Sequence, residues 1–227
     1  MARVPTVGGM PDFGSPLAAL FVLLLLAVML SFAFGTQRNI RVGNDRLRWL
    51  QSGLPALGAR ARLRWLGSSA VQLDIVEPVE PFREATVLVV LQPRDVPLLW
   101  LVSRARGRRD VVIVRGNLRR APTFDLEAAD PAAWLQASDS DEVAGWAEVE
   151  FGGSRASTAG AVQPQSVEAA RETWRRISGA GGVVWRLSIR RTVPHLEVHV
   201  RPDAMTTSSA DRLINPIVTL ATELTRI

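Results

Sequence analysis

The pattern His195-x-Glu197-x-His199 is the arrangement in this sequence that most resembles a metal site. Alternate side chains of a β-strand point to the same side, so three potential zinc ligands would share one face. At a rise of ~3.3 Å per residue, however, the two histidines would lie about 13 Å apart, too far to share one ion. We therefore expect no bound metal and instead a solvated cross-strand ladder in which Glu197 pairs with an arginine.

Other catalytic patterns are weaker. Glu148 and Glu150 could form a carboxylate pair, but they lie in an acidic run typical of a solvated surface. The sequence has no Gly-x-Ser-x-Gly motif and no cysteine, which excludes a serine elbow, a thiol nucleophile and disulfide bonds. The glycine-rich segment 179–182 follows an expected helix and precedes an expected strand, the reverse of a phosphate-binding loop. The sequence predicts no catalytic residue and no cofactor.

Charge is unevenly distributed along the chain, whose formal net charge is +5. Residues 104–120 contain seven arginines and one acid, a composition that could bind phosphate, whereas residues 121–154 contain eight acids and no base. The arginine-rich stretch holds no aromatic residue for stacking on bases, and the acidic stretch would repel a polyanion. We therefore expect no nucleic-acid binding, and expect the two stretches to pair with each other.

An uncharged segment covers residues 13–37 and follows a short tail, residues 1–12. This segment decides where the remaining chain lies relative to a membrane. About 20 apolar helical residues cross a ~30 Å hydrocarbon layer, so the segment predicts one transmembrane helix. Ser31-Phe32-Ala33 offers a cleavage site for a secretory signal, which is the alternative. The arginines after the segment outnumber Arg3 before it, which favours a retained signal anchor with the C-terminal domain in the cytoplasm.

Residues 38–58 form a basic juxtamembrane segment in which residues 44–52 are expected to be a short helix, with Asn44 as its N-cap and Gly53 past its end. Basic residues beside a membrane helix are attracted to anionic headgroups. Four arginines are predicted to rest on the membrane surface: Arg38, Arg41, Arg46 and Arg48.

The remainder predicts an α+β fold with an antiparallel sheet. Residues 59–151 are expected to form a β-rich meander in which the apolar runs 85–91 and 98–102 are strands. Residues 152–165, rich in Gly, Ser and Ala, are expected to be a flexible loop. Residues 166–227 predict an α-β-β-α section that, with the strand before it, makes a β-α-β-β-α unit; its last helix is expected to begin at Asn215 and Pro216.

Together these patterns predict a single-pass protein of the cell membrane that holds an α+β domain for binding another protein or a membrane complex. It is expected to be a non-catalytic accessory or adaptor protein. The alternative is an exported or extracytoplasmic ligand-binding domain with a cleaved or retained N-terminal signal, and membrane topology distinguishes the two. The sequence identifies neither a small-molecule ligand nor a particular partner.

Overall fold

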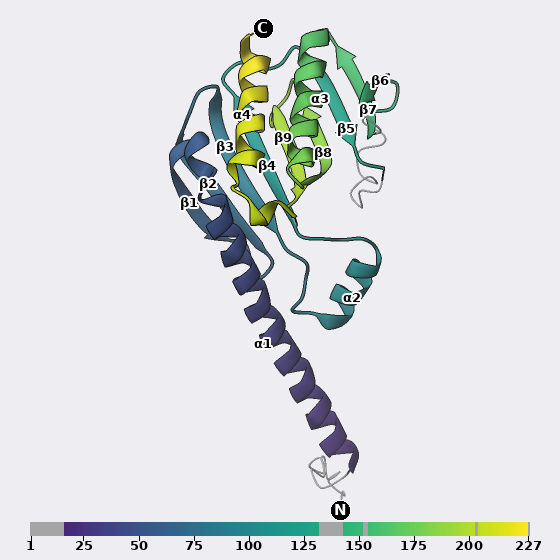
Figure 1. Cartoon of the computed structure of the whole chain (residues 1–227). Helices are drawn as coiled ribbons and strands as arrows, with labels where there is room; N and C mark the ends of the chain where they lie inside the picture. Colours follow the sequence, from purple (N-terminus) through teal and green to yellow (C-terminus); the bar gives the residue numbers. More distant parts are fainter. Residues whose placement is uncertain (1–15, 132–142, 152–153, 203, 227) are drawn as a thin grey trace, which may run out of the picture.

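The computed structural model describes residues 16–131, 143–151, 154–202 and 204–226. Helix α1 (Pro16–Leu50) extends from the N-terminal side into a domain that holds the rest of the described chain (Figure 1). It is long and apolar enough to cross a membrane, and none of its most apolar stretch is buried in the protein. The expected tail, residues 1–12, and the first three residues of the expected membrane segment lie outside the described residues.

Within the described residues the domain is built on one antiparallel nine-stranded sheet with the order β1-β2-β3-β4-β9-β8-β5-β7-β6. The first four strands form the expected meander, and the C-terminal hairpin β8–β9 inserts between β4 and β5. The strands are β1 (Gly58–Trp65), β2 (Ala70–Pro78), β3 (Phe82–Val90), β4 (Val111–Leu118), β5 (Phe124–Ala129), β6 (Ala147–Phe151), β7 (Ser154–Gly160), β8 (Val183–Ile189) and β9 (Leu196–Arg201).

Helices α3 (Pro164–Gly179) and α4 (Asp211–Arg226) lie side by side over one face of the sheet (Figure 1). Helix α2 (Pro97–Ala105) connects β3 to β4 in the sequence. It lies below the sheet in Figure 1 and contacts α1. Two short 3-10 turns, η1 (Leu54–Ala56) and η2 (Ala204–Thr207), precede β1 and α4. This α+β arrangement agrees with the predicted fold class, including the α-β-β-α section formed by α3, β8, β9 and α4.

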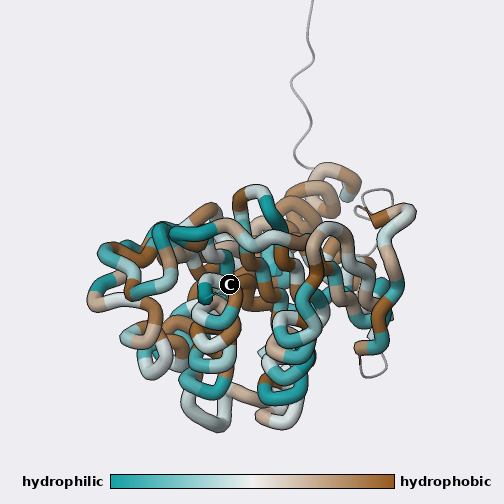
Figure 2. Tube along the Cα trace, turned by 90° about the horizontal axis from the view of Figure 1, so that it is seen from above, coloured by the Kyte–Doolittle hydropathy of each residue, from teal (hydrophilic) through white to brown (hydrophobic). Residues whose placement is uncertain are grey.

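The main core lies between the sheet and the helices, as expected from the period-2 pattern of the strands. On β9, Leu196, Val198 and Val200 are buried toward the helices, where they meet the apolar sides of α3 and α4. Figure 2 shows apolar residues (brown) and polar residues (teal) interspersed along the trace of the domain. Burial of this apolar surface is the main source of stability for the domain.

The C-terminal part of α1 is fixed to the domain by close contacts and hydrogen bonds. The ring of Trp65 on β1 occupies the space that a side chain at Gly43 would need, since a Cβ there would lie 2.5 Å from the ring. The Trp49 indole donates to the Ser208 carbonyl (2.8 Å), and Ser52 Oγ accepts from the Ala210 amide (2.9 Å). The apolar helix and the domain are therefore joined through a packed contact.

Two expectations about helices were wrong in their boundaries. The short helix expected at residues 44–52 is the end of α1, which continues through Gly43 because packing on Trp65 offsets the low helix propensity of glycine. The last helix begins at Asp211, one turn before the expected cap at Asn215, and includes Pro216. The Ser209 hydroxyl accepts from the Asp211 amide at this start (3.3 Å).

Two expectations about strands and loops were also wrong. Residues 98–102 form part of α2, which begins with Pro97, a residue suited to the first turn of a helix. Residues 152–165 are not one flexible loop, because Ser154–Gly160 is β7 and pairs with both β5 and β6. Its buried residues include the small Ala156 and Thr158, so the alternation is weak in hydropathy.

Candidate interaction face

The sheet face opposite α3 and α4 carries charged side chains along its central strands, and we call it the charged face. On β9, Glu197 and His199 alternate with the core residues and so point away from the helices. Arg115 of β4 lies directly opposite Glu197 in the strand register. The same alternation places Glu127 of β5 beside Arg186 of β8. Strand pairing therefore gathers these groups from four strands.

Glu197 is the centre of one cluster. Arg115 Nε donates to its Oε2 at 2.6 Å, and His199 Nε2 contacts its Oε1. Arg186 Nη1 lies 3.9 Å from Oε1. Burial disfavours the carboxylate, but the contacts with His199 and Arg115 outweigh burial and lower the pKa of Glu197 to about 2. Glu197 is therefore an anion at neutral pH, with both oxygens engaged.

Glu127 is the centre of a second cluster on the same face. Its Oε1 accepts from Arg186 Nε at 2.6 Å and its Oε2 accepts from Arg190 Nη2 at 2.7 Å. The Arg190 guanidinium also lies over the Trp146 ring, 4.8 Å from the ring centroid. Arg186 thus lies between two buried carboxylates, Glu127 and Glu197, and links the two clusters.

The three residues of the His-x-Glu-x-His pattern have different surroundings. His195 lies just before β9, where its Nδ1 accepts from the Leu118 amide at 2.9 Å and burial lowers its pKa. Glu197 pairs with Arg115, as expected, yet Glu197 and His199 are buried, so the expected solvated ladder was wrong. Among the described residues no group of three His, Cys, Asp or Glu side chains is placed to hold a metal ion.

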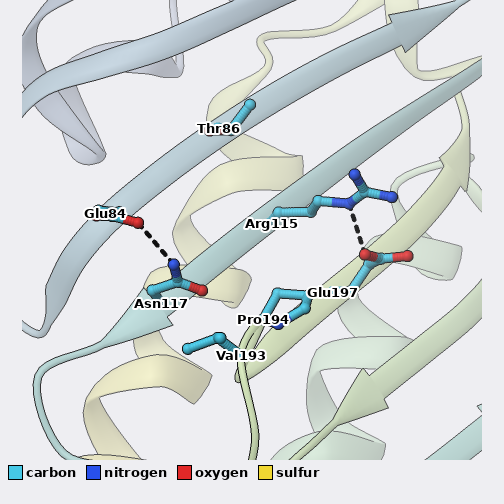
Figure 3. A pocket seen from close by; sticks show the side chains of 7 residues that line it. All are labelled: Glu84, Thr86, Arg115, Asn117, Val193, Pro194 and Glu197. Atoms are coloured by element: carbon cyan, nitrogen blue, oxygen red, sulfur yellow. Dashed lines mark hydrogen bonds and ion pairs between the residues drawn. The ribbon is translucent and has the colours of Figure 1, made fainter.

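Two shallow hollows open on this side of the domain, at the tip of the β8–β9 hairpin. One, of about 430 Å³, is lined by residues of β3, β4 and the hairpin, with the Glu84–Asn117 and Arg115–Glu197 contacts on its floor (Figure 3). The other has about 500 Å³ and lies beside Trp146 and Arg190. Val193, at the hairpin tip, lines the first hollow and is 66% exposed. An open surface with an apolar tip and fixed charges can bind a complementary protein surface.

The predicted membrane-surface residues all lie on α1. Arg38, Arg41 and Arg48 are exposed, Arg46 is half-buried, and Arg48 pairs with Asp45 at 2.9 Å. Because α1 rises ~1.5 Å per residue, Arg38 and Arg48 are separated by about 15 Å along the helix axis. The four arginines therefore do not form one layer around the helix, and their contact with a membrane stays a prediction.

The expected pairing of residues 104–120 with residues 121–154 is not found among the ion pairs that the structure describes. Arg115 pairs with Glu197, and Arg119 pairs with Glu80. The acids of the second stretch pair with the β8–β9 region instead, as in the contact of Asp125 with Arg191 at 2.8 Å. For Arg115, Arg119 and Asp125 the expectation was wrong, because the order of strands in the sheet decides which charges become neighbours.

The sequence reasoning did not select Glu127, Trp146 and Val193 as parts of one face. The alternation of Arg186 and Arg190 with apolar residues indicated that β8 has a charged side, which an acid such as Glu127 could face. Nothing in the sequence indicated which acid would lie opposite them.

No known protein-family model matches this sequence, and no curated protein matches it.

Proposed function

We propose that this chain is a membrane-anchored, non-catalytic adaptor protein that presents the charged face to a protein partner. The observation that carries the proposal is that α3 and α4 cover one face of the sheet, whereas the other face holds ordered ion pairs beside two open hollows. Fixed charges of both signs select partners by complementarity and orient them on approach. The exposed Val193 supplies an apolar contact at the edge of that pattern.

Binding is favoured over catalysis by the state of the acids on this face. Glu127 is held by Arg186 and Arg190, and Glu197 is held by Arg115 and His199, so both oxygens of each carboxylate are engaged. A general acid or base needs a pKa near the working pH, whereas the pKa of Glu197 is lowered to about 2. These groups suit a fixed electrostatic pattern better than proton transfer.

The anchor in this proposal is α1, with residues 17–34 in the hydrocarbon layer. The arginines at positions 38, 41, 46 and 48 favour a cytoplasmic domain. A reporter fused after Ile227 should then behave as cytoplasmic. Activity of a periplasmic-type phosphatase fusion, or a processed N-terminus at Phe34, would support the exported ligand-binding domain instead.

Site-specific photocrosslinking in cells tests the interaction face. A photoreactive amino acid at Val193 or Thr86, both lining the first hollow, should give one adduct of defined mass with another protein. The matched control is Arg175, an exposed position on the outer side of α3, which should give no such adduct. Arg115→Glu should abolish the Val193 adduct while the protein stays folded. Equal labelling from Val193 and Arg175 would refute the proposed face.

A further inference from the structure

Helix α2 has a polarity opposite to that of a helix in a water-soluble domain. Among its nine residues, all of them described, Ser103 alone is buried. Four of its large apolar side chains are exposed instead, with Leu98 at 73% and Leu101 at 59%, while Trp100 is half-buried. The exposed Leu98, Leu99, Leu101 and Val102 lie on one side of the helix, away from Trp100 and Ser103, and the preceding Val96 is also exposed. Such a patch on a protein surface marks a site of contact.

The position of α2 along α1 indicates what it contacts. The chain leading into α2 passes directly over Gly35, where a Cβ would lie 2.1 Å from the Arg94 carbonyl oxygen. Gly35 directly follows the apolar run that ends at Phe34, and the first charged residue of α1 after that run is Arg38. Where α1 spans a bilayer, this level is the boundary between hydrocarbon and headgroups. Figure 1 shows α2 beside α1 on the side of the domain that faces the apolar part of the helix.

A buried polar cluster holds α2 at this level. Arg94 donates to Asn39 Oδ1 on α1 (3.1 Å) and to Asp110 Oδ2 before β4 (2.8 Å). Asp110 Oδ1 accepts from the backbone amide of Gln92 (2.8 Å). The Gln92 side chain in turn accepts from the Trp100 indole (2.8 Å). The two ends of the α2 segment are thus tied to α1 and to each other.

The charges near α2 suit an anionic surface. Arg104 lies in the last turn of α2, with its Cζ 5.8 Å from the Trp100 ring centroid. Arg106 and Arg109 follow within five residues. A helix with apolar residues on its exposed side and arginines at its end is typical of helices that lie in the membrane interface. Tryptophan is also enriched at that level.

We infer that α2 is a second membrane contact, a short helix that lies in the bilayer interface with its leucines in the acyl-chain boundary. This inference rests on the proposed anchoring of the chain by α1. It assigns to α2 a lipid surface rather than a protein partner, because α2 lies where the apolar stretch of α1 ends.

The absence of cysteine makes single-cysteine labelling of the full chain direct. Leu98→Cys carries an environment-sensitive fluorophore in the chain reconstituted in vesicles of phosphatidylcholine and phosphatidylglycerol. Leu24→Cys, in the apolar part of α1, reports insertion of the anchor. Val193→Cys is the matched control, because it is an exposed apolar residue far from the anchor.

The label at Leu98 should show blue-shifted emission and lose most of its intensity when the vesicles contain a phospholipid with a nitroxide on its acyl chain. The label at Val193 should show neither effect. A Leu98 label that resembles the Val193 label while the Leu24 label is quenched overturns the inference about α2 and leaves the anchor intact. An unquenched Leu24 label refutes the anchor itself, and the inference with it.

Dilution of the protein in lipid distinguishes a bilayer contact from a contact with a second copy. The shift at Leu98 should stay constant as the ratio of protein to lipid falls. A shift that disappears on dilution, together with disulfide-linked dimers of unlabelled Leu98→Cys, would assign α2 to self-association and overturn the inference.

Discussion

Helices α2 and α4 belong to the same chain but place their leucines in opposite environments. In α4, Leu213, Leu220 and Leu224 are buried against the sheet. In α2, Leu98, Leu99 and Leu101 are exposed and the buried residue is a serine. The difference shows that α4 is arranged for a surface within the protein, whereas the apolar surface of α2 lacks a covering contact from the described part of the chain.

The largest expected effect comes from truncating one leucine in each helix. Leu220→Ala should lower the free energy of unfolding by about 2–5 kcal/mol, because it leaves a cavity in the core. Leu98→Ala removes the same atoms from an exposed position and should change the free energy of unfolding by no more than about 0.5 kcal/mol. Thermal unfolding of the full chain in mild detergent measures both. Equal losses would mean that α2 is part of the folded core.

The next effect concerns the contact that holds α2 against α1. Gly35→Leu should cost about 1–3 kcal/mol, because the new side chain meets the backbone of Arg94 and Asp95. It should also change the emission of a fluorophore at position 98 in vesicles. Gly179→Ala is the control, since a Cβ there meets no atom within 4 Å. An unchanged label in Gly35→Leu would show that α2 does not depend on α1 for its position.

Lowering the pH should destabilise the sheet that α4 packs on, through protonation of Glu197 on β9. The pKa of Glu197 is about 2 in the folded chain, below its usual value of 4.5, so its stabilising contribution is complete above pH 4.5 and is lost as pH falls toward 2. Glu197→Gln should lower the stability at pH 7 by about 1.5–3 kcal/mol and flatten this dependence. The label on α2 should be unaffected by the substitution at pH 7. Glu80→Gln, on an exposed acid, is the control.

The smallest effect is expected from single exposed arginines. Arg104→Gln should reduce the attraction of α2 to anionic vesicles by about 1 kcal/mol, and Arg175→Gln on α3 should not. The measure is the fraction of phosphatidylglycerol needed for half of the emission shift at position 98. Identical titrations for the two variants would show that charge does not contribute to the α2 contact.

Periodicity made parts of the fold predictable from the sequence. The apolar run of α1 exceeds the length of any core strand, and the alternation over residues 185–189 and 196–200 is strict, so these elements were identified correctly. Apolar runs of five residues, such as 98–102, do not distinguish a strand from a helix. The alternation in β7 is carried by Ala156 and Thr158, which hydropathy hardly separates from their neighbours.

The charged face could be predicted only in part. That Glu197 pairs with an arginine followed from its place on a strand, but its partner Arg115 is 82 residues away in the sequence. Arg186 and Glu127 are 59 residues apart. Such pairs depend on the order of strands in the sheet, which is set by the packing of the whole domain. That order cannot be read from the alternation of apolar and polar residues within each strand.

The joint between α1 and the domain has a consequence for how the charged face meets its surroundings. A domain attached to a bilayer by one helix changes its inclination to the membrane whenever that helix tilts. With α2 as a second contact away from the axis of α1, this tilting is restricted, and the charged face keeps one inclination to the membrane plane while the whole chain still turns about the membrane normal. A partner in the same membrane then meets a surface whose inclination is already set, so less rotational freedom is lost when the two bind.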